Sequence, residues 1–96
     1  MISTKERATL RGFSNNLPDL VFVGKEGVTQ NVIKQVLDNL TAHELIKIKV
    51  QQNSEQNARE VCAVLVEETG AEPISVVGSK IVLYKRTDKK GFKHYL

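Results

Sequence analysis

Apolar residues recur along this chain at two spacings, and the changes between them outline its helices and strands. In residues 29–41 and 58–69 an apolar side chain returns every third or fourth position, which predicts two helices that each bury one face. In residues 45–50 the spacing is two, so Lys47 and Lys49 fall on the face opposite the apolar side chains. This segment is predicted to be a strand with one buried face and one half-exposed, basic face.

Three shorter apolar runs also predict strands. Residues 20–23 form a continuous run, which is typical of a strand covered on both faces. Residues 74–77 and 81–84 are separated by little more than Gly78-Ser79, a pair that predicts a two-residue hairpin. The last two strands are therefore expected to be antiparallel neighbours.

Capping signals mark the ends of the predicted helices. Residues 3–6 read Ser-Thr-Lys-Glu, a capping box that begins a first helix, which we expect to end at Gly12. Asn53 is predicted to cap the third helix, with Gln56 three residues on, and Gly70 to end it in a left-handed conformation. The side chains expected to face inward from the first helix are Leu10, Phe13 and Leu17.

The predicted order of elements is αβαβαββ. Successive strand–helix–strand units favour right-handed crossovers, and the final hairpin adds an antiparallel pair. We therefore predict an α/β fold in which a mixed four-stranded sheet packs against helices. A chain of 96 residues has room for one domain with one core. Within residues 1–96 we expect an ordered core over about residues 3–86 and a loose basic tail over residues 87–96.

Charge is distributed unevenly along the chain. The net charge is +3, but residues 53–72 hold five acids against a single base, Arg59. The C-terminal segment has one acid, Asp88, among the basic residues Lys80, Lys85, Arg86, Lys89, Lys90 and Lys93. A domain with one acidic helix and a basic remainder suits a polyanionic partner on one side only.

The segment Gly24-Lys25-Glu26-Gly27 lies between a predicted strand and a helix that Thr29 can cap. Glycines at both ends allow a tight turn and a close approach of the backbone to a ligand. Free N–H groups, the positive end of the helix and the Lys25 ammonium would together form a phosphate site. The alternative is a plain turn with an exposed lysine, and Glu26 repels phosphate unless it points away.

Other basic side chains widen this surface if the fold brings them together. The candidates are Arg7, Arg11, Lys47, Lys49, Lys85 and Arg86. The two lysines share a strand face, and the two arginines lie one helical turn apart. In the tail, Phe92 and Tyr95 lie among basic residues, a composition that suits single-stranded RNA. A solvated sheet surface and a solubilising tail are the alternatives.

Few residues of this chain are suited to catalysis. Cys62 is the single cysteine and lies on the apolar side of a predicted helix, so we expect it in the core. His43 and His94 are far apart in sequence, and neither a metal site nor a nucleophile–base pair can be assembled around them. We therefore expect no enzyme activity, no cofactor or metal and no small-molecule substrate.

The apolar runs also bear on where the protein works. None approaches the roughly 20 residues that span a bilayer, and residues 1–13 contain no apolar core of a secretory signal. We expect a monomer in the cytoplasm that has no contact with membranes.

Five short segments occur in a recognisable order: residues 23–29, 43–50, 68–71, 77–78 and 82–85. Each is unspecific alone, but the ordered set, over about residues 3–86, resembles the CRM domain, the chloroplast RNA splicing and ribosome maturation family. Its stand-alone bacterial members are the YhbY-like proteins. Two places depart from the family's pattern. Residues 14–19 lack its small-residue–histidine pair and Lys-Pro, and Ser79-Lys80 stands where it has an arginine.

The resemblance implies a fold similar to the C-terminal domain of translation initiation factor three. It also implies RNA binding through the Gly24–Gly27 loop and neighbouring basic surface, and, for bacterial members, association with precursors of the large ribosomal subunit. The leading hypothesis is a non-enzymatic RNA-binding protein that acts in ribosome assembly. The alternatives are a protein-interaction adaptor that uses the acidic face of the third helix, and a small phosphoryl-handling enzyme built on the loop.

Overall fold

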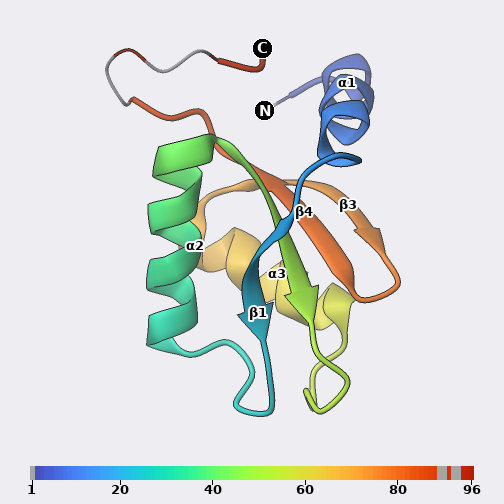
Figure 1. Cartoon of the computed structure of the whole chain (residues 1–96), viewed down its shortest axis with the longest axis vertical. Helices are drawn as coiled ribbons and strands as arrows, with labels where there is room; N and C mark the ends of the chain where they lie inside the picture. Colours follow the sequence, from blue (N-terminus) through green and yellow to red (C-terminus); the bar gives the residue numbers. More distant parts are fainter. Residues whose placement is uncertain (1, 89–90, 92–93) are drawn as a thin grey trace.

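The computed structural model describes residues 2–88, 91 and 94–96 of this chain. Its elements follow the predicted order: α1 (Thr4–Ser14), β1 (Asp19–Val23), α2 (Gln30–His43), β2 (Leu45–Val50), α3 (Ala58–Thr69), β3 (Glu72–Val77) and β4 (Lys80–Tyr84). Figure 1 shows α1 and both chain ends at one end of the molecule, and the loops that follow β1 and β2 at the other. These are named the terminal end and the loop end below. The predicted α/β fold is confirmed.

The four strands form one mixed sheet in the order β1-β2-β4-β3. β1 and β2 are parallel, and α2 supplies the crossover connection that a parallel pair requires. β4 lies between β2 and β3 and is antiparallel to both. The predicted Gly78-Ser79 hairpin is confirmed, and β1 and β3 form the two edges of the sheet.

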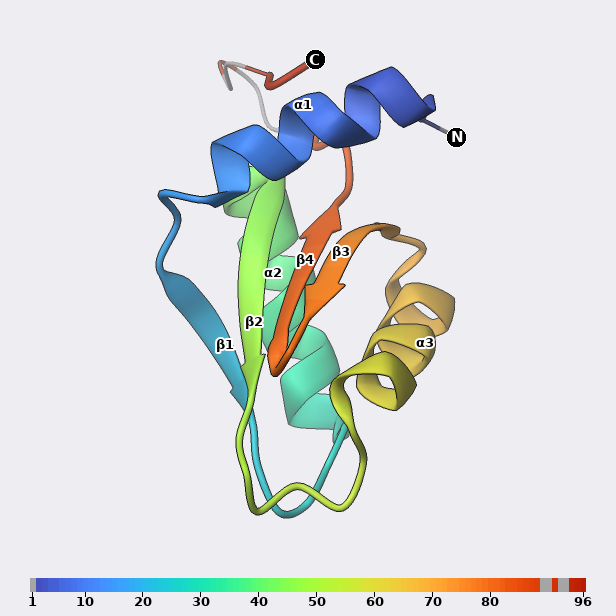
Figure 2. The same ribbon diagram turned by 90° about the vertical axis from the view of Figure 1, so that its right-hand side faces the viewer.

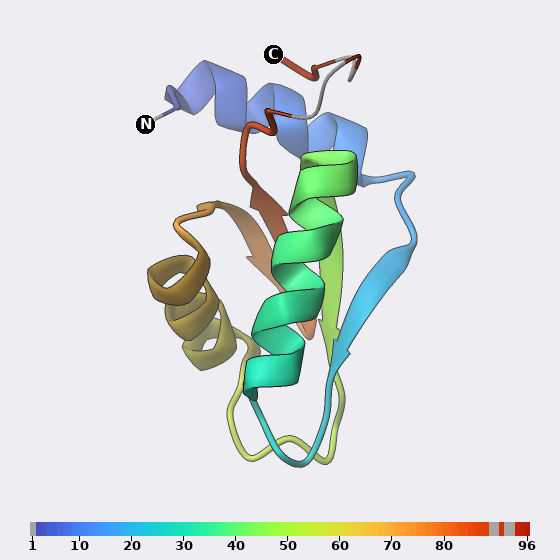
Figure 3. The same cartoon turned by 90° about the vertical axis from the view of Figure 1, so that its left-hand side faces the viewer.

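One face of the sheet is covered by α2 and α3 (Figure 3). The main helix residues buried there are Val32, Val36, Leu40, Val61, Cys62 and Leu65. They pack against sheet residues that include Val21, Val23, Ile46, Ile48, Ile81 and Leu83. Burial raises the pKa of the Cys62 thiol above its ordinary value. Among the described helices, none is long and apolar enough to cross a membrane.

Of the described part of the chain, the segments that cover the opposite face lie at the terminal end, where α1 crosses it (Figure 2). Leu10 is buried there against a second, smaller cluster formed by Leu45, Ile74, Val82 and Tyr84. Phe13 was expected to face inward, but its side chain is 48% exposed. Its ring lies against that of Tyr95, with 5.3 Å between the centroids.

Two predicted helix boundaries are wrong. α1 continues past Gly12 to Ser14, because an isolated glycine weakens a helix without ending it. α3 begins at Ala58 with Asn57 as its N-cap, rather than near Asn53. The Asn57 side chain accepts the N–H of Glu60 at 2.9 Å, and the Glu60 carboxylate accepts the N–H of Asn57 at 3.1 Å. This capping box leaves residues 51–57 as a loop.

Beyond α1, no described helix covers the second face of the sheet. Phe22 is 51% exposed, so the prediction that its strand is covered on both faces is wrong. β1 is an edge strand, and α1 lies at the other end of the sheet. Phe22 is in register with Lys49, Lys49 with Lys80, and Lys80 with Val77. Residues in register on neighbouring strands project to the same side, so these four side chains form one row, named here the open face.

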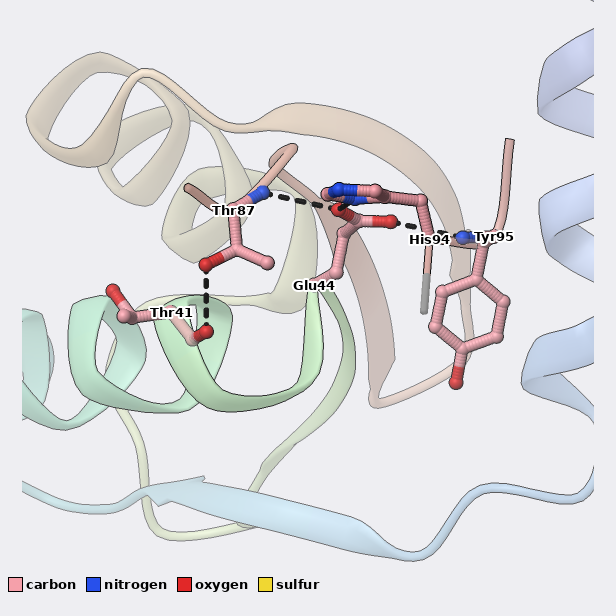
Figure 4. A network of polar contacts seen from close by, with 5 residues as sticks. All are labelled: Thr41, Glu44, Thr87, His94 and Tyr95. Atoms are coloured by element: carbon pink, nitrogen blue, oxygen red, sulfur yellow. Dashed lines mark hydrogen bonds and ion pairs between the residues drawn. The ribbon is translucent and has the colours of Figure 1, made fainter. Parts of the chain in front are cut away.

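A buried carboxylate holds residues beyond Arg86 against α2 (Figure 4). Glu44, the C-cap of α2, is 0% exposed. Its Oε2 accepts the N–H of Thr87 at 3.0 Å and lies 2.6 Å from Nδ1 of His94. Its Oε1 accepts the N–H of Tyr95 at 3.0 Å. The expectation of a loose tail is therefore wrong for Thr87, His94 and Tyr95. Lys89, Lys90, Phe92 and Lys93 lie outside the described residues.

Candidate nucleic-acid interface

Residues 24–27 form the turn that leaves β1 at the loop end. The N–H of Gly27 donates to the carbonyl of Gly24 at 3.0 Å and closes the turn. Gly27 has a φ of +70°, a conformation in which any side chain is strained. Lys25 and Glu26 occupy the tip and are exposed. The turn therefore presents one positive and one negative side chain to solvent.

Directly after this turn, α2 begins with its N–H groups toward the same region. Thr29 is the N-cap, and its hydroxyl accepts the N–H of Val32 at 3.2 Å. The first turn of α2 contains no acid, so the partial positive charge of the helix end is not offset within it. A hollow here is lined by Phe22, Gly24, Lys25, Glu26, Gly27, Thr29, Asn31, Val32 and Gln35. All the loop residues expected from the sequence thus surround one helix N-terminus, an arrangement that suits an anion.

The loop of residues 51–57 lies beside this turn (Figures 2 and 3). The N–H of Gln51 donates to the carbonyl of Val23 at 2.8 Å and joins the two segments. A Cβ at Gly24 would lie 2.9 Å from Oε1 of Gln51, and a Cβ at Gly27 would lie 2.9 Å from Oε1 of Gln56. The two glycines therefore leave room for amide side chains. Neither glutamine was expected in the site, because the predicted cap at Asn53 places Gln56 in the third helix and leaves Gln51 before it.

Lys47 and Lys49 project from β2 on the side away from α2 and α3, as predicted. Lys49 is in register with Phe22 and Lys80, while Lys47 is in register with Asp19. Lys80 forms an ion pair with Asp19 across the sheet. Neither Phe22 nor Lys80 was expected in the site. A continuous apolar run does not show which of its residues are exposed when the strand lies at the edge of the sheet. A single lysine after a hairpin does not by itself indicate a binding site.

The two arginines of α1 lie at the terminal end, away from the turn (Figure 2). Arg7 is already bonded to the protein: its Nε donates to the carbonyl of Pro73 at 3.1 Å, and its guanidinium lies 3.9 Å from the Glu72 carboxylate. Arg11 is exposed on the same helix. The fold therefore separates this pair from the hollow at the loop end.

Lys85 and Arg86 also lie at the terminal end, directly after β4. The Lys85 ammonium donates to the carbonyl of Thr69 at 2.7 Å, where it caps the C-terminal end of α3. Arg86 is exposed. The basic residues expected in one site thus fall into two groups, one at each end of the sheet.

The acids of α3 lie on the other side of the sheet from the lysines of β2. Glu60, Glu67 and Glu68 are exposed on this helix, which packs on the covered face. Because the sheet separates these carboxylates from the open face, they do not oppose an anion bound there. The two-sided charge distribution expected from the sequence is present in the fold.

The groups exposed at the loop end are suited to binding a ligand. Over residues 2–88, 91 and 94–96 there is no group of three or more His, Cys, Asp or Glu side chains placed to hold a metal ion. Cys62 is buried, His43 is exposed at the end of α2, and His94 contacts Glu44 at the terminal end. The hollow instead offers backbone N–H groups, a cation and an aromatic ring. These groups suit phosphate and base recognition.

Comparison with known proteins identifies a matching domain family and relatives that are named as RNA-binding proteins. The model of the CRS1/YhbY (CRM) domain matches residues 2–85. The chain is 38% identical over 87 residues to the "Probable RNA-binding protein YqeI" of Bacillus subtilis, covering 91% of each protein. It is 31% identical to an "RNA-binding protein" of Haemophilus influenzae, covering 92% of this chain and 89% of the relative.

A solved structure also matches this chain over nearly its whole length. The solution structure of a Staphylococcus aureus protein superposes with a TM-score of 0.79 at 36% identity and covers 94% of both chains. The matched domain extends over nearly all of the present chain, from α1 to the end of β4. This protein therefore belongs to the CRS1/YhbY (CRM) domain family.

Proposed function

We propose that this protein binds RNA through its loop end. The observation that carries the proposal is the hollow in which Lys25 and the Gly24–Gly27 turn meet the N-terminus of α2. Beside it, Lys47 and Lys49 form a basic strip on the uncovered side of β2. The names of the Bacillus and Haemophilus relatives, which describe RNA-binding proteins, support this assignment.

Each group has a distinct role in the proposed complex. Gly24 and Gly27 shape the turn, Lys25 contacts phosphate, and Thr29 fixes the start of α2 so that its N–H groups meet the backbone of the RNA. Glu26, at the tip of the turn, also lines the hollow, and its carboxylate must turn toward solvent when a phosphate binds. Because phosphate contacts dominate, binding is salt-sensitive and only modestly sequence-specific.

The terminal end makes outlying contacts in this proposal. The candidate site residues at this end are Arg7, Arg11, Lys85 and Arg86. The molecule is 36 Å along its longest axis, so an RNA reaches them only if it extends over the length of the domain. Short oligonucleotides therefore bind the loop end without involving these side chains.

We further propose that the RNA is ribosomal and that the protein acts on precursors of the large ribosomal subunit. In this role it works as a monomer in the cytoplasm, without cofactor, metal or catalysis. Membership of the CRS1/YhbY (CRM) domain family supports this assignment. Crosslinking in cells followed by sequencing of the bound RNA tests it. Enrichment of precursor large-subunit RNA is expected, and recovery of unrelated RNA alone would contradict a role in ribosome assembly.

The test of the loop is a matched pair of charge reversals. Lys25→Glu is expected to weaken RNA binding by about 1–3 kcal/mol, because it replaces an attractive charge with a repulsive one. Lys5→Glu makes the same change in net charge on the exposed surface of α1 and should leave binding nearly unchanged. Fluorescence anisotropy with a labelled RNA measures both. Equal loss in the two variants, or none in either, would show that the loop is only a turn.

A further inference from the structure

We infer that Phe22 is a stacking platform for an unpaired base, so that the loop end recognises single-stranded rather than duplex RNA. The inference rests on the proposed function and names the form of RNA that the site takes. It starts from the 51% exposure of a phenylalanine next to the last residue of a strand. One exposed apolar side chain is ordinary on a protein surface, so the residues around Phe22 decide whether it belongs to a binding site.

Phe22 is shared by two hollows at the loop end. On one side it lines the hollow formed by the Gly24–Gly27 turn and the start of α2. On the other side it lines a second hollow, whose other lining residues are Lys49, Val50, Gln51, Gln52, Asn53 and Ser79. The Phe22 ring therefore lies between the hollow at the N-terminus of α2, which suits a phosphate, and the second hollow. A nucleotide whose phosphate lies at the N-terminus of α2 has its base next to this ring.

The second hollow has the chemistry of a base site. Gln51, Gln52 and Asn53 are exposed there, and their amides both donate and accept hydrogen bonds, as the edges of unpaired bases require. Lys49 supplies a positive charge in register with the ring. None of the described residues that line this hollow is acidic.

The lysines beside Phe22 favour a nucleic acid over an apolar protein segment as the ligand of this surface. On the open face Lys49 and Lys80 lie directly beside Phe22 and between it and Val77 at the opposite edge, which is 70% exposed. An apolar partner that covered this row would have to remove two ammonium groups from water, one of which is already paired with Asp19. A base stacked on the ring with its phosphate near Lys49 satisfies both features.

A duplex does not fit this arrangement. Its bases are already stacked on one another, and their faces are not available to a side chain. The ring of Phe22 lies on the uncovered side of the sheet, where the base that stacks on it must be splayed out of a duplex. The inference therefore predicts a preference for single strands, loops or bulges.

Substitutions at Phe22, compared with the same change at Phe13, test the inference. Phe22→Leu keeps apolar area but removes the aromatic face, and should weaken binding of a short single-stranded RNA by about 5- to 150-fold, the range found for stacked bases. Phe13→Leu is the matched control: that ring is 48% exposed but lies on α1 at the terminal end, so affinity should not change. Binding of a perfect duplex should be the same in wild type and Phe22→Leu. Thermal unfolding of both variants shows whether each is folded.

A tryptophan at the same position provides a second readout. The chain contains two tyrosines and no tryptophan, so Phe22→Trp introduces a single tryptophan that can be excited selectively. This variant should bind single-stranded RNA at least as tightly as the wild type, and its fluorescence should be quenched by the stacked base. An oligonucleotide with the bases removed and the phosphates kept should bind more weakly and leave the fluorescence unchanged.

The outcomes separate this inference from the function on which it rests. If Lys25→Glu weakens binding while Phe22→Leu does not and the tryptophan is not quenched, the protein binds RNA by phosphate contacts alone and stacking is wrong. If the wild type binds neither single-stranded nor duplex RNA, the proposed function and the stacking site both fall. Tighter binding of the duplex than of the single strand would also overturn the inference.

Discussion

At the terminal end of the sheet, three charged side chains are bonded to other parts of the protein. Arg7 donates to the carbonyl of Pro73, Lys85 donates to the carbonyl of Thr69, and Glu44 accepts the backbone N–H groups of residues 87 and 95. These bonds join segments that are distant in sequence. At this end charge stabilises the fold, and α1 covers the sheet above a small apolar cluster.

At the loop end, the charged side chains face solvent. Lys25 and Glu26 are exposed at the tip of a turn, Lys49 is partly exposed on β2, and the amides of residues 51–53 are exposed beside them. The sheet is uncovered here, and Phe22 stands half exposed on it. The one ion pair described on this part of the open face joins Lys80 to Asp19.

The difference explains why counting basic residues in the sequence overstates the size of a binding site. Basic side chains near α1 and after β4 have the composition of a nucleic-acid surface, yet two of them make hydrogen bonds to backbone carbonyls. A lysine or arginine that is already bonded to a backbone carbonyl is held in place and has fewer N–H donors left for a phosphate. The loop end should therefore dominate affinity, and the terminal end should dominate stability.

The largest expected effect is the loss of stability in Glu44→Gln. This change keeps the shape of the side chain but removes the buried charge that faces His94 and two backbone N–H groups (Figure 4). We expect it to lower the free energy of unfolding by about 2–4 kcal/mol, because donors at a buried site lose a charged acceptor. Glu68→Gln, on the exposed surface of α3, should stay within about 0.5 kcal/mol. Urea unfolding at neutral pH measures both, and equal effects would show that the network adds nothing to stability.

The same variant has a defined pH dependence. Burial alone would raise the pKa of the Glu44 carboxyl, but hydrogen bonds from His94, Tyr95 and Thr87 outweigh it and hold this pKa below its ordinary value of 4.5. Stability from a lowered carboxyl pKa is complete above the unfolded value and is lost as the pH falls through the folded one. The stability difference between wild type and Glu44→Gln should therefore be full at neutral pH and shrink below pH 4.5. A difference that stays constant into acid would contradict this account.

A smaller effect is expected at the loop end from Gly27→Ala. A φ of +70° costs a side-chain-bearing residue about 1–2 kcal/mol, and the new Cβ would approach Oε1 of Gln56 to 2.9 Å. Stability should fall by that amount, and RNA affinity should fall as the turn changes shape. Gly12→Ala is the matched control at the terminal end. A Cβ there meets nothing within 4 Å, and alanine in a helix should raise stability by about 0.5–1 kcal/mol.

The helices and the buried face of β2 could be predicted from the sequence because their burial follows a simple period. The burial of β1 could not, since its apolar run fits a central strand as well as an edge strand, and only the strand order leaves Phe22 exposed. Two asparagines, Asn53 and Asn57, each precede a Gln or Glu by three positions, and the structure selects the second. Asn53 instead lies in the loop that packs on Gly24. The Glu44 network joins residues more than 40 positions apart, for which no local pattern exists.

A moderate effect on affinity is expected from the pair Lys47→Gln and Lys49→Gln. Each lysine that neutralises a phosphate of a single strand contributes about 0.7 to the slope of log affinity against log salt, so removing both should shallow the slope by at most about 1.4. The matched change at the terminal end, Arg7→Gln with Arg11→Gln, removes the same charge but should leave the slope for a short oligonucleotide nearly unchanged. Titrations at several salt concentrations measure both slopes. A larger change in the arginine pair would place the RNA across α1.

The smallest effect is expected from neutralising the acids of α3, which lie across the sheet from the lysines. Glu60→Gln, Glu67→Gln and Glu68→Gln together should leave RNA affinity nearly unchanged at physiological salt, where screening acts over roughly 8 Å. Glutamine at position 60 can still complete the capping box with Asn57, so the fold of α3 should be kept. The triple change makes the protein more positive by three charges, which would strengthen binding wherever RNA ran along this helix. Much tighter binding of this variant, together with a silent Lys47 and Lys49 pair, would show that RNA lies on α3 and that the open face is not the site.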